Sequence, residues 1–206
     1  MEILTVIPAR SGSKGIKNKN IKLLNGKPLI SYTIKEALKS SYLKKENIIC
    51  STDSKKIADM AKKYGANIPF MRPKKYASDK ASSIAVAKHA LKYMEKIKKI
   101  KYDLLLLLQP TSPLRKAFHI NEAIKLIKKK NKDAVVSVTT PEQSPYKMKK
   151  INKEKELEDL IDLDLDYKRR QDLPKVYAQN GAIYLTKRNI ILKQSSFFGK
   201  HSIGYY

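Results

Sequence analysis

The sequence predicts an α/β fold in which a mainly parallel sheet lies between layers of helices. Short apolar runs rich in β-branched residues alternate with amphipathic helical patterns along the chain. The longest apolar run, Leu104–Leu108, shows no polar alternation, which is typical of a central strand covered on both faces. No segment repeats, and no Gly/Ser-rich or Pro-rich linker divides the 206 residues. We therefore expect a single domain, 1–206, with the architecture of a Rossmann-like three-layer sandwich.

The first half of the chain contains two predicted strands with a helix between them. Leu4–Ile7 is the first strand and Ile48–Cys50 is the second. Pro28 is expected to open the helix, because proline is well suited to a helix start. The apolar residues that follow recur at nearly the helical period of 3.6: Leu29, Ile30, Ile34, Ala37 and Leu38.

Small polar residues mark the starts of the next two helices. Asp53 or Ser54 can cap a helix that Gly65 ends, and Ser82 or Ser83 can head the following one. Beyond the central run, the spacing of Ile120, Ala123, Ile124 and Ile127 predicts a further helix. The apolar run 134–138 predicts another strand.

Residues 141–172 interrupt this alternation, because they are charged, rich in Lys and poor in large apolar side chains. We interpret them as an arm that leaves the core. Strand character returns at Val176–Tyr177 and Ala182–Leu185. Ligands of such sheets bind at the carboxyl ends of the strands, so the loops expected to carry the chemistry are 8–20, 51–54, 72–83, 109–115 and 177–181.

Composition excludes several classes of protein. The 44 basic and 19 acidic residues give a net charge of +25, but the excess is mostly Lys in short scattered runs, without Trp or interleaved Arg and aromatic residues. That pattern favours a solvated surface, able to steer anionic substrates, over a nucleic-acid reader, although a basic nucleic-acid-binding module stays an alternative. The single cysteine, Cys50, excludes an internal disulfide and any multi-cysteine metal site. No apolar run approaches the ~20 residues of a membrane span, and we expect a cytoplasmic protein that binds neither membrane nor nucleic acid.

The loop after the first strand, Pro8-Ala9-Arg10-Ser11-Gly12-Ser13-Lys14-Gly15, combines glycines, hydroxyls and two cations. Glycines let backbone N–H groups approach an anion, and Arg10 and Lys14 add positive charge. The loop matches neither GxxxxGK[ST] nor GxGxxG. It nevertheless predicts a phosphate-binding site at the end of the strand.

Together with this loop, later motifs resemble the CMP-sialic acid synthetases (N-acylneuraminate cytidylyltransferases). The resemblance spans nearly the whole chain, in order. It rests on Lys19-Asn20, Gly26-Lys27-Pro28-Leu29-Ile30, Ser51-Thr52-Asp53-Ser54, Arg72-Pro73, Ala77-Ser78-Asp79-Lys80-Ala81-Ser82-Ser83, His89-Ala90-Leu91, Leu107-Leu108-Gln109-Pro110-Thr111-Ser112-Pro113-Leu114-Arg115 and Asn180-Gly181-Ala182-Ile183-Tyr184.

The resemblance implies that the anomeric hydroxyl of sialic acid attacks the α-phosphate of CTP, releasing pyrophosphate with the help of Mg²⁺. Such displacement needs mainly positioning and neutralised charge. Arg10 and Lys14 would be catalytic and hold the triphosphate, and Arg72 would read cytosine through donors to its O2 and N3. The nucleotide-binding set implied is Ala9, Arg10, Ser11, Gly12, Lys14, Asn20, Arg72, Ala81 and Ser83. Legionaminic, pseudaminic and 3-deoxy-manno-octulosonic acid remain alternative acceptors.

The resemblance also implies a sugar-acid site completed by a homodimer. Gln109, Asn180 and Gly181 would contact the acid, and Lys147 and Arg170 match positions that reach it across the dimer. The arm at 141–172 would then be the dimerisation element. Gln179 stands where many relatives carry Arg, so recognition of the carboxylate is expected to differ.

One departure concerns the metal. The family carries a Ser-x-Asp-x-Asp element that binds Mg²⁺, and this sequence stops at Tyr206 before any such element. We expect no metal site within the chain, although Mg²⁺ is the expected cofactor, and a truncated form that binds CTP with little activity is a further alternative. Asp162, Asp164 and Asp166 form no defined cage in the sequence. His89, His119 and His201 are isolated and are expected to pack or cap, and Cys50 is expected in the core.

Overall fold

The computed structural model describes residues 1–13, 15–161 and 168–206. The chain forms two compact units. The first contains residues 1–137 and 181–205, and the second contains residues 138–180 with Tyr206. Lys14 and the Asp162, Asp164 and Asp166 run lie outside the described residues.

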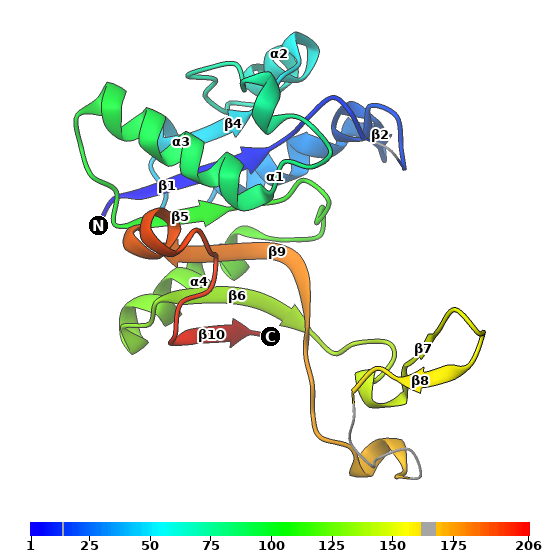
Figure 1. Ribbon diagram of the computed structural model, residues 1–206. Helices are drawn as coiled ribbons and strands as arrows, with labels where there is room; N and C mark the ends of the chain where they lie inside the picture. Colours follow the sequence, from blue (N-terminus) through cyan, green and yellow to red (C-terminus); the bar gives the residue numbers. More distant parts are fainter. Residues whose placement is uncertain (14, 162–167) are drawn as a thin grey trace. The chain divides into compact units, whose positions relative to one another are not determined.

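The first unit is built on the expected sheet, whose strands follow the order β10-β6-β9-β5-β1-β4 (Figure 1). β1 pairs in parallel with β4 and β5, and β10 pairs in parallel with β6. β9 runs antiparallel to β5. The strands span β1 Ile3–Pro8, β4 Ile48–Ser51, β5 Leu104–Leu107, β6 Ala134–Thr139, β9 Ala178–Lys187 and β10 Ser202–Tyr205.

Helices cover both faces of this sheet, which confirms the predicted three-layer arrangement (Figure 1). The α-helices are α1 Leu29–Leu38, α2 Lys55–Lys63, α3 Ser83–Lys98 and α4 Ala117–Lys130. Shorter turns of helix are η1 Lys19–Ile21, η2 Lys45–Asn47, η3 Lys74–Tyr76 and the π-helix Ile190–Gln194.

Alternate residues of the strands explain how two cores form on one sheet. Leu104, Leu106 and Leu108 pack in the core that also contains apolar residues of α1, α2 and α4. Leu105 and Leu107 pack on the opposite face, with α3 and the π-helix. Successive strand residues point to opposite faces, so the continuous leucine run supplies both cores.

Local signals placed the helix ends correctly. Ser54 caps α2, where its hydroxyl accepts a hydrogen bond from the Ile57 N–H, and Ser82 caps α3 in the same way through Ala85. Gly65 follows α2 with a φ of +98°, a conformation that glycine adopts without strain. His119 caps α4 by accepting the Lys116 N–H at 2.9 Å, and Cys50 is buried.

Three features of the strands differ from the expectation. Val176–Tyr177 precedes β9 and lies outside it. β10 and the two-residue hairpin of β2 Leu23–Leu24 with β3 Lys27–Pro28 had no strand signal in the sequence. β10 contains Gly204, and β2 and β3 are short and mostly exposed, so neither carries the apolar pattern of a buried strand.

The predicted arm, 141–172, lies within the second unit. It holds η4 Pro145–Lys147, a hairpin of β7 Lys149–Ile151 with β8 Leu157–Asp159, and η5 Arg170–Asp172. Ile151 faces Leu157 across the hairpin, yet these side chains are 72% and 71% exposed. Association of the arm with a second chain is not tested by this arrangement and stays a prediction.

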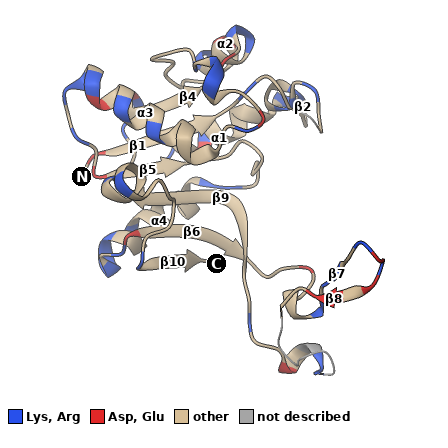
Figure 2. Ribbon diagram, in the orientation of Figure 1, with Lys and Arg blue, Asp and Glu red and all other residues tan. Residues whose placement is uncertain are grey.

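The lysine runs of the two longest helices lie at the solvated surface, as the sequence predicted. Figure 2 shows Lys and Arg on the outer sides of α3 and at the end of α4, where Lys96, Lys98 and 128–130 are exposed. Within the described residues, no helix combines the length and apolar character that a membrane span requires.

Candidate active site

A cavity of about 380 Å³ opens at the carboxyl ends of β1 and β5, beside the loops predicted to carry the chemistry. This volume lies in the usual range of small-molecule sites. All of its lining residues belong to the first unit. They are Pro8, Arg10, Ser13, Gly15, Lys19, Asn20, Arg72, Tyr76, Ser78, Ala81, Ser83, Val86, Gln109, Pro110 and Thr111.

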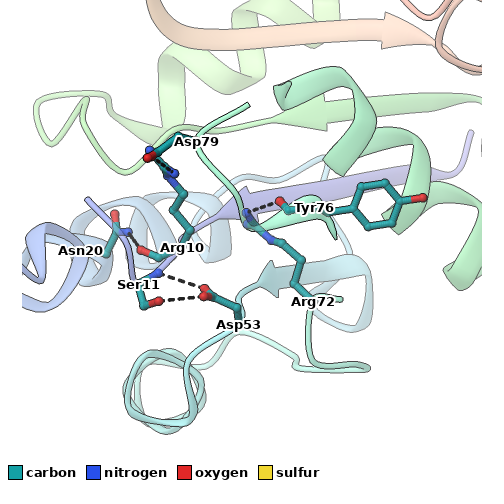
Figure 3. A network of polar contacts seen from close by, with 7 residues as sticks. All are labelled: Arg10, Ser11, Asn20, Asp53, Arg72, Tyr76 and Asp79. Atoms are coloured by element: carbon teal, nitrogen blue, oxygen red, sulfur yellow. Dashed lines mark hydrogen bonds and ion pairs between the residues drawn. The ribbon is translucent and has the colours of Figure 1, made fainter. Parts of the chain in front are cut away.

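Hydrogen bonds hold the 8–20 loop in place. The Ala9 N–H donates to the Ser51 carbonyl at 2.9 Å, which extends the pairing of β1 with β4. The buried Asn20 amide donates to the Arg10 carbonyl at 3.0 Å (Figure 3). Ser11 donates to Asp53 twice, from its backbone N–H at 2.9 Å and from its hydroxyl at 2.7 Å. The loop is therefore tied to the end of the neighbouring strand.

Asp53 is a structural carboxylate in this arrangement. Its partial burial raises its pKa, but the two hydrogen bonds from Ser11, together with its own backbone N–H and the charge of Arg72, hold the pKa below its usual value. An ionised carboxylate that already accepts these bonds favours the loop conformation.

Arg10 lines the cavity and contacts the 72–83 loop. Its Nη1 lies 2.5 Å from Oδ1 of Asp79 (Figure 3). Both side chains are partly exposed, so the pair is open to exchange with another anion. The cation predicted to hold phosphate is thus present at the cavity with a carboxylate bound to it.

Arg72 is buried, with 6% of its surface exposed, and it lines the same cavity. Nε donates to the Ser51 hydroxyl at 3.0 Å, Nη2 donates to the Ser51 carbonyl, and Nη1 lies 3.5 Å from the Tyr76 carbonyl. Burial lowers the pKa of this guanidinium from its ordinary value. A guanidinium has five N–H donors, so these bonds among the described residues leave two for a ligand.

An aromatic cluster supports the 72–83 loop from behind. The ring of His89, on α3, packs against Phe70 and Tyr76, each with its centroid 4.8 Å away. Tyr93 lies next to both His89 and Phe70. The buried Nδ1 of His89 has no hydrogen-bond partner among the described residues, and burial lowers the pKa of the ring, helped by Lys75 and Arg72. The neutral His89 ring packs against Tyr76, and Tyr76 in turn lines the cavity.

The start of α3 closes the cavity on this side. Ser82 caps the helix, and Ala81 and Ser83 line the cavity beside it. The N–H groups at the start of a helix carry partial positive charge and favour anionic or acceptor groups nearby.

Gln109 also lines the cavity, two residues beyond β5. Gly181 lies against it: a Cβ atom at Gly181 would sit 2.9 Å from Oε1 of Gln109. Gly181 has a φ of +75°, so both its conformation and the approach of the amide favour glycine. Arg115 bonds the backbone of this region, donating to the carbonyls of Gln109 and Ala182.

The structure brings most of the predicted nucleotide-binding residues to one cavity. Arg10, Asn20, Arg72, Ala81 and Ser83 line it, together with Gln109. Ala9, Ser11 and Gly12 shape the 8–20 loop without lining the cavity, and Lys14 lies outside the described residues. Lys147, Arg170 and Asn180 belong to the second unit, and of Arg170 only the backbone is described.

Several lining residues were not in the predicted set. Tyr76, Ser78 and Val86 enter from the 72–83 loop and α3, and Pro110 and Thr111 enter from the loop after Gln109. Tyr76 had a possible signal, because it lies between Arg72 and the Ala81–Ser83 segment on a loop that was itself predicted to carry function.

The carboxylates near the cavity do not form a magnesium site. Asp53 accepts two bonds from Ser11, and Asp79 is paired with Arg10. No group of three or more His, Cys, Asp or Glu residues gathers anywhere in the described part of the chain. Mg²⁺ beside a nucleotide is usually held by one or two carboxylates together with the phosphates, and no described carboxylate lines the cavity. The described residues therefore do not fit this ion, and the expected cofactor stays a prediction.

Comparison with known proteins points to one family. A family model described as cytidylyltransferase matches residues 4–203. The N-acylneuraminate cytidylyltransferase of Escherichia coli O18:K1:H7 is 40% identical over 99% of this chain, which spans only 46% of that relative. The CMP-N,N'-diacetyllegionaminic acid synthase of Legionella pneumophila is 39% identical over 97% of the chain and 84% of its own length.

The solved structures agree on the fold. A CMP:2-keto-3-deoxy-manno-octonic acid synthetase, determined with CTP, aligns with a TM-score of 0.67 at 17% identity. The alignment covers 95% of this chain and 78% of that protein. At this identity the likeness supports the three-layer α/β architecture alone.

Proposed function

We propose, on the premise that this chain belongs to the cytidylyltransferase family, that it transfers CMP from CTP to the anomeric hydroxyl of sialic acid. The hydroxyl oxygen forms a bond to the α-phosphorus and loses its proton. The bond from the α-phosphorus to the oxygen bridging the β-phosphate breaks, and pyrophosphate leaves. The observation that carries this proposal is the convergence of Arg10, Arg72, Ser83 and Gln109 on one cavity.

The charged and polar groups of the cavity are proposed to bind different parts of the nucleotide. Arg10, with Asn20 and the glycine-containing backbone of the 8–20 loop, is suited to the triphosphate, because phosphoryl transfer needs fixed positive groups and N–H donors. Ala81 and Ser83 are proposed to bind the cytosine together with Arg72. Arg72 is suited to the base, since its two remaining N–H donors match the acceptors O2 and N3 of cytosine. Arg10 and Lys14 are proposed as the catalytic cations.

Gln109 and Gly181 are proposed to contact the sugar acid, because an amide can donate to a carboxylate and accept from hydroxyls. Lys147, Arg170 and Asn180 of the second unit are proposed to complete that site, with Lys147 and Arg170 supplied by a second chain in a homodimer. The metal does not enter this scheme, because the described residues form no site for it.

A second acceptor is supported by the comparisons. The Legionella pneumophila relative, named for legionaminic acid, is nearly as identical to this chain as the E. coli relative named for acylneuraminate. Legionaminic acid is therefore the leading alternative to sialic acid, with the same nucleotide and the same leaving group.

The test is release of pyrophosphate from CTP with each of sialic, legionaminic, pseudaminic and 3-deoxy-manno-octulosonic acid, at saturating Mg²⁺. The kcat/KM ratios rank the acceptors, and UTP in place of CTP is the nucleotide control. Turnover that is highest with sialic acid supports the proposal. Turnover confined to another acid corrects the acceptor, and no turnover with any of them overturns the function of this chain.

A further inference from the structure

Arg115 joins three segments of the first unit from a buried position. Its Nη1 donates to the carbonyl of Gln109 at 3.2 Å and to the carbonyl of Ala182 at 2.7 Å. Its Nη2 donates to the hydroxyl of Thr33, on α1, at 2.7 Å. Only 4% of Arg115 is exposed. One guanidinium therefore connects the loop after β5, the β9 strand and a covering helix.

The two carbonyls belong to residues that meet at the cavity. Gln109 lines the cavity, and Ala182 directly follows Gly181, against which the Gln109 amide lies. A change in the distance between these two backbone segments would move the amide away from Gly181 or press it into the backbone. Arg115 bridges this distance, although it does not line the cavity itself.

The charge of Arg115 is not neutralised by a contacting carboxylate in the described residues. Glu36 is the carboxylate whose charge acts on it, but that carboxylate is bonded to Lys39 and to the Ala117 N–H. The Nε of Arg115 is buried without a partner in the described part of the chain, and burial lowers the pKa of the side chain to about 10. The group is still protonated near neutral pH, so a positive charge lies behind Gln109.

We propose that Arg115 is a positioning residue, which holds the Gln109 amide at the acid-binding end of the cavity. This inference rests on the proposed function, because it assigns Gln109 to the sugar acid. Lysine in place of Arg115 keeps the charge but lacks the planar fork that bridges two carbonyls and a hydroxyl.

The first experiment compares Arg115→Lys with Arg188→Lys, a control arginine that is bound to Glu95 away from the cavity. We expect Arg115→Lys to raise the KM of the sugar acid about tenfold, the effect of losing roughly one charge-assisted hydrogen bond, with the KM of CTP within about twofold. Arg188→Lys is expected to leave both values unchanged. Equal rises in both KM values for Arg115→Lys would indicate a purely structural role and overturn the proposal.

A double-mutant cycle tests whether Arg115 acts through Gln109. In a Gln109→Ala background, Arg115→Lys is expected to add little further increase in the KM of the acid, because the amide it positions is gone. Fully additive effects would contradict the inference. If the wild-type chain shows no turnover with any acid, the proposed function fails first, and the Arg115 measurements have no bearing on that failure.

Thr33 provides a milder pair of variants if Arg115→Lys does not fold. Thr33→Val removes the hydroxyl that accepts from Nη2 while keeping the shape of the side chain, and Thr33→Ser keeps the hydroxyl. We expect Thr33→Val to raise the KM of the acid more than that of CTP, and Thr33→Ser to restore it. Failure of Thr33→Val to separate the two KM values would count against Arg115 as a positioning residue.

Discussion

Arg10 and Asp79 form an ion pair at 2.5 Å that joins the loop after β1 to the loop before α3 (Figure 3). The pair occupies the cation that the proposed function assigns to phosphate. Binding of a triphosphate would therefore have to exchange one anion for another at Arg10.

Removing the competing carboxylate should strengthen nucleotide binding. Asp79→Asn is expected to tighten CTP by up to about fivefold, because a partly exposed ion pair is worth about 0.2–1 kcal/mol. Titration calorimetry with CTP and with cytidine checks this, and cytidine should change little. Asp59→Asn, an exposed carboxylate on α2, is the control for the change in net charge. Weaker CTP binding in Asp79→Asn would show that Asp79 assists the nucleotide.

Arg10→Ala tests the phosphate assignment directly. A charge-assisted hydrogen bond to phosphate is worth roughly 1.5–3 kcal/mol, so CTP should bind about ten to a hundred times more weakly. Cytidine, which lacks the phosphates, should bind nearly as well as before. Equal losses of affinity for CTP and cytidine would contradict the assignment of Arg10 to the phosphates. Arg188→Ala is the control variant.

Arg72→Ala tests the reading of the base. Uracil carries a donor at N3 where cytosine carries an acceptor, so the Arg72 donors favour cytosine. The variant is expected to bind CTP more weakly and to discriminate less against UTP. The ratio of the Kd for UTP to the Kd for CTP should fall. A ratio equal to that of the unmodified chain would exclude Arg72 as the residue that recognises the base. Circular dichroism must first show that the variant is folded, since Arg72 also holds Ser51.

His89 should make stability depend on pH. The unfolded side chain titrates near 6.5, and burial, with Lys75 and Arg72, lowers the pKa in the folded chain. Below pH 6.5 the unfolded chain therefore binds a proton that the folded chain does not, so the free energy of unfolding falls as the pH drops from about 7 to about 5. Urea unfolding at several pH values should show a smaller fall in His89→Phe. Parallel curves for the two proteins would contradict this role.

The sequence predicted those parts of the fold that are determined by residues close to one another in the sequence. The run 104–108 has apolar residues at every position, which predicts a covered strand, and the caps Ser54 and Ser82 were each one of two adjacent candidates directly before a helical pattern. Gln109 was found because it directly follows the predicted strand 104–108, whereas Arg72 was marked only by the family resemblance. These signals are local, so they can be read from the sequence without knowing which strands pair.

The parts that were not predicted depend on pairing between distant segments. The antiparallel direction of β9 follows from its partner β5, not from its own residues. Arg115 was noted only as part of the loop after Gln109, because its partners Thr33 and Ala182 lie far away in the sequence. The Arg10–Asp79 pair likewise required the two loops to be brought together by the sheet.

β6 and β9 are neighbours in the sheet, and the second unit is inserted between them in the sequence. The chain leaves the first unit after Ser137 and returns at Gly181, and the Ser137 hydroxyl accepts the Ile183 N–H at 2.7 Å, so the exit and the re-entry are neighbours. A brief turn could bridge them at little entropic cost. A chain shortened in this way retains every residue that lines the cavity, and we expect it to bind CTP while losing transfer to the acid. Nucleotide capture and acceptor choice would then be separable parts, free to change independently.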